Sequence, residues 1–350
     1  MFPYDAGVGT PRLLALAALA GVVGITLVST AVVAPAGELV LPPTRTAAER
    51  IVADYNEVNA NNNATLDIEG QAAIEAPPIR SIDDATFREF QGRGQTTLGD
   101  EFAVDDVTVF VPDQSKYPLM FLALERITSP AATESNQQFL VFAKASSDAP
   151  WKATFAAALL PDATVPRVAT DQDDLATLVT GQLAASLQVN PTKLGPKLAR
   201  LWQRSARGVA IAKPFSPGLL TTEAVNLFLG RLEQLSLNES RVDFDFTSSE
   251  SQPVCFASVG DGALCFFVID YTATLDPVSG SFVQDDGRAT LSGLVTPGEY
   301  GGVIFEYTAI VLAAVPKQGK LARVDVVGFY NGLVAAEALP RGVDIPADAV

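Results

Sequence analysis

An uncharged apolar run near the amino terminus is the strongest constraint on how this chain can fold. The stretch RLLALAALAGVVGITLVSTAVVAPAGE has no charged residue between Arg12 and Glu38, and its apolar part extends from Leu13 to Ala34. As a helix this part would be about 33 Å long, compared with about 30 Å for the hydrocarbon core of a bilayer. It has no polar face, and a proline-containing segment follows it. The run therefore predicts a transmembrane helix and not a buried core helix.

The same run leaves two alternatives for the mature protein. A secretory signal peptide has a shorter apolar region, of about 7–15 residues, before a small-residue cleavage site. The length favours an uncleaved signal anchor, while Ala34-Pro35-Ala36 leaves cleavage and secretion as the alternative. The flanking basic residues are nearly balanced, so we base the orientation on the large region that follows the run. We expect a single-pass protein of the cell membrane, with the lipid bilayer as partner and the bulk of the chain extracytoplasmic.

Composition excludes several classes of chemistry. The chain of 350 residues contains no histidine, so a Ser-His-Asp triad, a Cys-His dyad and a His-based zinc site are ruled out. A net charge of −16 disfavours nucleic acid as a partner. Adjacent carboxylates, such as Asp83 and Asp84, are typical of caps and solvated turns. The sequence therefore predicts no catalytic residues, no metal site and no cofactor.

Two successive patterns of helices and then strands follow the apolar run. TAAERIVADYNEVN has a helical period, with Thr46 and Glu49 placed as a capping box, and NNNAT breaks the pattern. Strand-like segments come next, joined by short polar loops that indicate an antiparallel meander. They span residues 102–111, 117–127, 137–145 and 151–159.

Residues 160–174 are rich in proline and aspartate and form the best internal boundary. Helical patterns resume at LATLVTGQLAASL, and strand patterns then continue to residue 330. We therefore predict an α+β fold in which an N-terminal transmembrane helix precedes two helix-plus-antiparallel-sheet units. The predicted divisions are a signal anchor (1–37), a linker (38–45), a first unit (46–166), a second unit (167–335) and a carboxyl-terminal tail (336–350).

The two cysteines of the chain, Cys255 and Cys265, lie in PVCFASVGDGALCFFV. Each is five residues from Gly260, so a hairpin centred on this glycine would place the cysteines directly opposite each other, whereas a shift of one residue would separate their faces. Cross-strand Cβ atoms lie about 4.5–5.5 Å apart and disulfide Cβ atoms about 3.5–4.5 Å apart, so a bridge needs only local adjustment. An oxidising compartment favours the disulfide. Two buried thiols, or a reactive pair, are the alternatives.

Several stretches together resemble a known family. They are AERIVADYNEVN, YPLMFLAL and QQFLVFAKASSDAPWKATFAAALLP. With the preceding apolar run, they resemble an uncharacterised family of actinobacterial envelope proteins, many of them lipoproteins, whose units are similar to NTF2-like or cystatin-like cone folds. The likeness is best over residues 46–166 and implies no particular activity. This chain lacks the cysteine that carries the lipid in lipoproteins, so its anchoring would depend on the apolar helix.

These features predict a membrane-anchored extracytoplasmic protein that acts as a non-enzymatic binding or assembly module of the cell envelope. Its partner would be an envelope protein or a wall polymer. The alternative is an NTF2-like enzyme, of the isomerase or cyclase type, that uses a carboxylate in a cavity. A sealed cavity with an inward acid of raised pKa would favour the enzyme. An interior filled by phenylalanine and leucine would favour the binding or assembly role.

Overall fold

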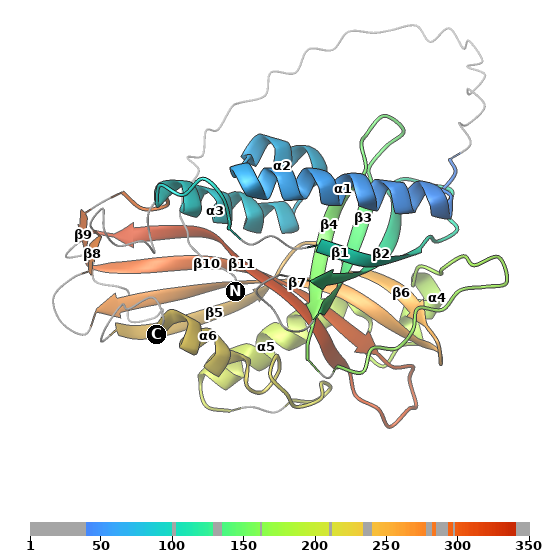
Figure 1. The fold of residues 1–350 in the computed structure, drawn as a ribbon. Coiled ribbons are helices and arrows are strands. Elements are labelled where there is room, and N and C mark those ends of the chain that lie inside the picture. The colour runs from blue at the N-terminus through green and yellow to red at the C-terminus, as the bar shows by residue number, and fades with distance from the viewer. Residues whose placement is uncertain are drawn as a thin grey trace, which may run out of the picture.

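The fold is a mixed α+β arrangement in which helices lie on both sides of one large antiparallel sheet (Figure 1). The computed structural model describes residues 40–99, 103–128, 135–161, 163–209, 212–233, 240–277, 282–284, 293–296 and 298–340. The predicted transmembrane segment, Leu13–Ala34, lies outside these residues. Within them, no helix is both long enough and apolar enough to span a bilayer.

The helices form two groups. In Figure 1 the first group, α1 to α3, lies above the sheet, and α5 and α6 lie below it. Their bounds are α1 (Arg45–Thr65), α2 (Ile68–Ile74), α3 (Ile79–Gly92), α4 (Gly181–Ala185), the 3-10 helix η1 (Pro191–Lys193), α5 (Leu194–Ala206) and α6 (Ala224–Glu233).

The main sheet contains nine strands, in the order β1-β2-β3-β4-β11-β10-β7-β5, with β6 also paired to β7. A separate pair is formed by β8 and β9. The bounds are β1 (Ala103–Phe110), β2 (Leu119–Thr128), β3 (Asn136–Lys144), β4 (Lys152–Leu159), β5 (Ser240–Ser248), β6 (Val254–Ser258), β7 (Gly262–Pro277), β8 (Phe282–Gln284), β9 (Gly298–Tyr300), β10 (Gly302–Val315) and β11 (Asp325–Leu339).

The first helix is longer than the sequence predicts. Its N-cap is Thr44, whose side chain accepts a hydrogen bond from the Ala47 backbone, so the predicted capping box at Thr46 is wrong. The helix also continues through NNNAT to Thr65. Asn62 is buried there, and its side-chain amide donates to Gln71 Oε1 at 3.0 Å. Asparagine usually breaks helices by bonding to nearby backbone, and this tertiary contact occupies its side chain instead.

The sheet continues across the predicted boundary between the two units. Strand β4 pairs with β11 through Gly328–Leu159 and Phe329–Ala158, so the two predicted units share one sheet. The proline- and aspartate-rich segment at that boundary, and the residues just after it, run along the outer edge of β6, where Val168 bridges Ser258 and Leu178 bridges Phe256. The predicted long helix at LATLVTGQLAASL is therefore wrong, because its first half is extended and only Gly181–Ala185 is helical.

Both faces of the central strands are buried. On β7, Cys265, Phe267 and Ile269 belong to the core between the sheet and helices α5 and α6. Leu264 and Phe266 alternate with them and belong to the other core, which also contains residues of α1, α3 and β1 to β4. Burial on both faces explains why the sequence ALCFFVI is continuously apolar and does not alternate with polar residues.

Candidate functional site

The two cysteines lie on the paired strands of the β6–β7 hairpin, near the end of β6 that is away from the turn. Ser258 pairs with Gly262, so Gly260 is the centre of a three-residue loop, and Cys255 lies directly opposite Cys265. Their Cα atoms are 4.1 Å apart and the sulfur atoms are bonded at 2.08 Å. The disulfide favoured by the sequence spacing is thus present in the structure. It is buried, with relative exposures of 4% for Cys255 and 0% for Cys265, so it staples the hairpin and offers no accessible thiol.

A pair of carboxyl groups lies between the upper helices and the sheet. Glu75 is at the C-cap of α2 and is fully buried, because its backbone is held against β4 by a bridge to Ala153. Asp83, on α3, is half-buried. Tyr55 of α1 donates a hydrogen bond to Glu75 Oε1 at 2.8 Å, and Tyr330 of β11 donates to Asp83 Oδ1 at 2.5 Å. Four separate elements therefore meet at the two acids.

The environment of this pair favours protonated acids. Burial, and then the nearby charge of Asp83, raise the pKa of Glu75 well above its ordinary value. Burial also raises the pKa of Asp83, to about 6, against hydrogen bonds from Tyr330 and Glu75 that lower it. The second carboxyl oxygen of Glu75, Oε2, is buried and accepts no hydrogen bond from an N–H or hydroxyl group of the described residues. We interpret the two acids as sharing a proton, held on Glu75 and directed at Asp83, because each acid is among the causes of the other's pKa shift.

Glu125 of β2 provides a useful comparison, because it is equally buried and yet fully paired. Asn56 of α1 donates to its Oε1 at 2.7 Å, and Gln138 of β3 donates to its Oε2 at 2.9 Å. Burial raises the pKa of Glu125, while these two amides lower it. Glu125 therefore reads as a structural acid that ties α1 to the sheet, whereas the acids of the Glu75–Asp83 pair depend on each other.

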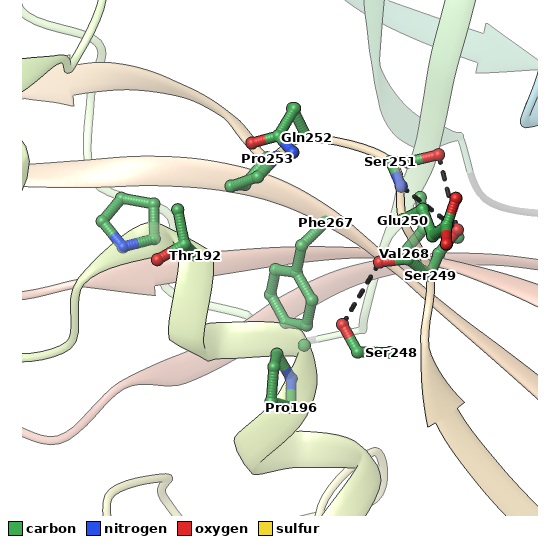
Figure 2. Close-up of a pocket in the computed structure, with 12 residues that line it drawn as sticks. Thr192, Pro196, Ser248, Ser249, Glu250, Ser251, Gln252, Pro253, Phe267 and Val268 are labelled. Carbon is green, nitrogen blue, oxygen red and sulfur yellow. Dashed lines mark hydrogen bonds between the residues drawn. The ribbon is translucent and has the colours of Figure 1, made fainter.

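The pocket shown in Figure 2 lies elsewhere, where the edge strand is interrupted. Ser248 pairs with Ile269 and Val254 with Phe266, so the five residues between the paired positions of β5 and β6 bulge out of the sheet. The bulge and the start of α5 line a partly open pocket of about 180 Å³. Serine and glutamine side chains line much of it, and none of its lining residues belongs to the acid pair.

Aromatic rings fill the layer between the sheet and the lower helices. Trp202 of α5 contacts Phe228 of α6 with ring centroids 5.2 Å apart, and Phe228 stacks on Tyr271 at 5.0 Å. Tyr271 in turn stacks on Tyr307 at 4.7 Å, and the Trp202 indole N–H donates to the Leu220 carbonyl at 3.1 Å. The rings that these contacts join form a packed core between the sheet and the lower helices.

Sequence reasoning missed the acid pair. It assigned Asp83 and Asp84 to caps and solvated turns, and this is wrong for Asp83, which faces Tyr330 from the other end of the chain. No local pattern could reveal the pair, because Asp83 and Tyr330 are 247 positions apart. The only available signal was Glu75 before Pro77-Pro78, in a short and otherwise apolar segment. Among the described residues, no group of three or more metal-ligating side chains is present.

The fold and site define a mixed α+β protein with an antiparallel sheet, a buried disulfide and a buried carboxyl pair. Over residues 43–338 the chain matches a family described as a domain of unknown function, DUF8094. The match covers most of the chain, which therefore belongs to this family. The chain is also 27% identical, over 291 residues, to an uncharacterised lipoprotein of Streptomyces avermitilis, and this match covers 81% of each chain. No solved structure matches, so the NTF2-like character of the predicted units stays a prediction.

Proposed function

We propose that this protein is a membrane-anchored, extracytoplasmic component of the cell envelope that acts as a binding or assembly module. The Cys255–Cys265 disulfide carries the proposal, because structural disulfides persist in oxidising compartments and are rare in the cytosol. The similarity to an uncharacterised lipoprotein supports an envelope location. Anchoring would use the apolar segment Leu13–Ala34, because the chain's two cysteines, Cys255 and Cys265, lie far from this run and form the disulfide.

A topology experiment on intact cells tests this proposal. Full-length protein is produced in a bacterial host, and the cells are treated with a protease that does not cross the membrane. We expect the folded region to be cleaved on intact cells or spheroplasts, and the disulfide to be recovered in non-reducing peptide maps. Protection from the protease together with two free thiols would contradict the proposal. Mass spectrometry of the mature amino terminus separates an anchored chain from a cleaved one, since a start at Gly37 would exclude the anchor.

A second candidate function has one observation in its favour. The Glu75–Asp83 pair is an inward acid group of raised pKa, which is the arrangement expected of a cavity carboxylate in an enzyme. Against it, the Glu75 side chain is fully buried beneath Tyr55, and the hollow of Figure 2 is lined by other residues. The aromatic filling on the other side of the sheet also supports a binding or assembly role.

Chemical modification of the acids distinguishes the two candidates. A water-soluble carbodiimide with a small amine is applied to the native protein, and the modified acids are mapped by mass spectrometry. We expect the exposed Asp54 and Glu57 of α1 to react, while Glu75 reacts only after unfolding. Modification of Glu75 at a rate similar to that of Asp54 in the native protein would show that small molecules reach the pair, and would favour the enzyme.

A further inference from the structure

The exposed side of α5 carries a continuous row of basic residues. Lys193, Lys197, Arg200, Arg204 and Arg207 follow one another at intervals of three or four, so they share one face of the helix. All five are exposed, while the opposite face buries leucines and Trp202 in the core. The helix contains no acidic residue. Within the described part of the chain, none of the five forms an ion pair.

The stability of the helix explains only part of this row, because Arg204 lies in the last turn, where the helix dipole favours a cation. Like charges three or four residues apart repel each other. Lys193 and Lys197 also lie at the start of the helix, where the helix dipole disfavours cations. The chain as a whole carries a net charge of −16, so five unpaired cations on one face form a local exception to its surface. An external anionic partner would supply the counter-charge that the chain itself does not place beside these cations.

A second basic segment lies in the loop between β10 and β11. Residues 317–323, with the sequence KQGKLAR, are all exposed and contain three basic residues and no acid. Lys317 forms an ion pair with Asp261 at 3.2 Å. Lys320 and Arg323 are therefore the two cations that this segment adds to the basic row of α5. Backbone contacts between Phe215 and Val324 join this loop to the segment that follows α5. The two basic segments therefore belong to adjoining parts of the lower side of Figure 1.

Exposed apolar side chains accompany these cations. Val209, which follows α5, is 55% exposed, Leu219 is 45% exposed, and Leu321 of the basic loop is fully exposed. They lie in the segments that connect α5 to α6 and β10 to β11, on the side away from α1 to α3. Cations beside protruding apolar side chains are typical of surfaces that bind lipid headgroups and the adjoining acyl region. A soluble polyanion would use the charges and leave Leu321 without a partner.

We propose that α5, with the loops that carry Val209, Leu219 and Leu321, is a docking surface for an anionic phospholipid bilayer. This α5 surface would act as a second contact beside the N-terminal segment, and in that respect it rests on the proposed envelope function.

The test uses the full chain with a fluorophore at the proposed contact. Leu321→Cys is labelled with an environment-sensitive dye, after the buried native disulfide has been shown to be intact. Thr96→Cys, an exposed site beyond α3, is the matched label on the other side of the sheet. Each labelled chain is reconstituted into zwitterionic vesicles and into vesicles that also contain phosphatidylglycerol. We expect a blue-shifted emission at position 321 in the anionic vesicles only, reversed by high salt, and no shift at position 96.

Charge variants show whether α5 itself makes the contact. The triple variant Lys197→Gln, Arg200→Gln and Arg204→Gln should reduce the ratio of docked to undocked protein by roughly a hundredfold, since each basic residue near an anionic surface contributes a factor of about five. A control removes the same charge from the upper helices. It combines Arg45→Gln, Arg50→Gln and Arg88→Gln, and it should leave the shift unchanged. Both variants are first compared with the parent chain by circular dichroism.

The remaining outcomes separate this proposal from the anchor. If the chain floats with zwitterionic vesicles and position 321 shows no shift in anionic ones, the α5 surface is wrong and the anchor stands. If the chain floats only with anionic vesicles, and only at low salt, the anchor is wrong and the α5 surface stands. A shift that survives the α5 triple variant would overturn the proposal. So would tight binding to soluble polyphosphate without binding to anionic vesicles, because it would identify a polymer as the partner.

Discussion

At the scale of single residues, the Glu75–Asp83 pair should make the stability of the folded protein depend on pH. A folded-state pKa above the ordinary value means that the folded protein binds more protons than the unfolded chain. For Asp83 this excess lies between its ordinary pKa of 3.8 and about 6. Stability should therefore be highest below this window and should fall as the pH rises through it. Glu75, whose pKa is also raised, continues the loss at higher pH. Asp84, the residue after Asp83, forms ion pairs with Arg80 and Arg88. Its carboxylate is the other negative charge close to Asp83.

We predict that Asp83→Asn stabilises the protein at pH 7 by about 1–3 kcal/mol, because it removes a buried charge while keeping an acceptor for Tyr330. Urea unfolding of the parent and the variant between pH 4 and pH 8 measures the difference. The stability gap should open as the pH rises from about 4 to about 6. Asp54→Asn, at an exposed position on α1, is the control and should change little. Parallel stability curves for Asp83→Asn and the parent would refute the shared-proton interpretation.

At the scale of elements, α3 lies on β11 at a position where only glycine fits. A Cβ atom built on Gly332 would overlap the side chain of Ile82. The close approach lets Asp83, the next residue of α3, reach Tyr330 on the same strand. The acid pair thus depends on one small residue in β11.

Gly332→Ala should destabilise the protein by about 1–3 kcal/mol through overpacking. The same substitution made together with Ile82→Ala should cost less than it does alone, because the overlapping Cγ1 and Cγ2 atoms are gone. Part of the cost should remain, since Cβ of residue 82 stays 2.6 Å from the new methyl group. A double-mutant cycle from chemical unfolding measures this coupling. Equal costs of Gly332→Ala in both backgrounds would show that the contact does not set the distance between α3 and β11.

The outer edge of β5 is closed by a side chain. Gln203 of α5 donates to the Phe244 carbonyl at 2.9 Å and accepts from the Phe246 N–H at 2.9 Å. One amide therefore imitates the two hydrogen bonds that a neighbouring strand would make. Unpaired strand edges are sites of association between chains, and this pairing protects the edge.

Gln203→Ala should lower stability by about 1–3 kcal/mol and increase self-association, because it leaves both backbone groups unpaired. Gln203→Glu is the informative intermediate, since it keeps an acceptor for Phe246 and loses the donor to Phe244. Arg204→Ala, the exposed neighbour, serves as the control for loss of a long side chain on α5. Unfolding curves and sedimentation velocity report the two effects. Unchanged stability in Gln203→Ala would mean that water replaces the amide at no cost.

At the scale of the whole molecule, the shared sheet predicts one cooperative unit where the sequence predicts two. Each half contains one tryptophan: Trp151 packs on Phe121 with ring centroids 5.1 Å apart, and Trp202 of α5 is buried in the core between α5 and the sheet. Trp151→Phe and Trp202→Phe each leave a single fluorescent reporter in one half. In each variant, fluorescence and far-ultraviolet circular dichroism should give the same unfolding midpoint. Two separated transitions would show that residues 46–166 and 167–335 fold independently.

The sequence predicts the strands much better than their arrangement. Period and turn residues place β1 to β4 within one or two residues, because strand patterns are local. The spacing of Cys255 and Cys265 about Gly260 is likewise local and gives the hairpin register. The pairing of β4 with β11 and the contact of Asp83 with Tyr330 join distant parts of the chain. Such contacts leave no periodic mark in the sequence, so they required the structure.

The pairing of β4 with β11 also has a consequence for the timing of synthesis. Leu159 and its partner Gly328 are 169 residues apart. At roughly 5–20 residues per second, the ribosome makes β11 about 10–30 seconds after β4. During that interval the inner edge of β4 lacks its partner, and Phe155 lacks the ring of Phe266 that it contacts in the finished fold. The amino-terminal half must therefore wait for the carboxyl-terminal strand, and a folding helper acting in this interval would bind the β4 edge.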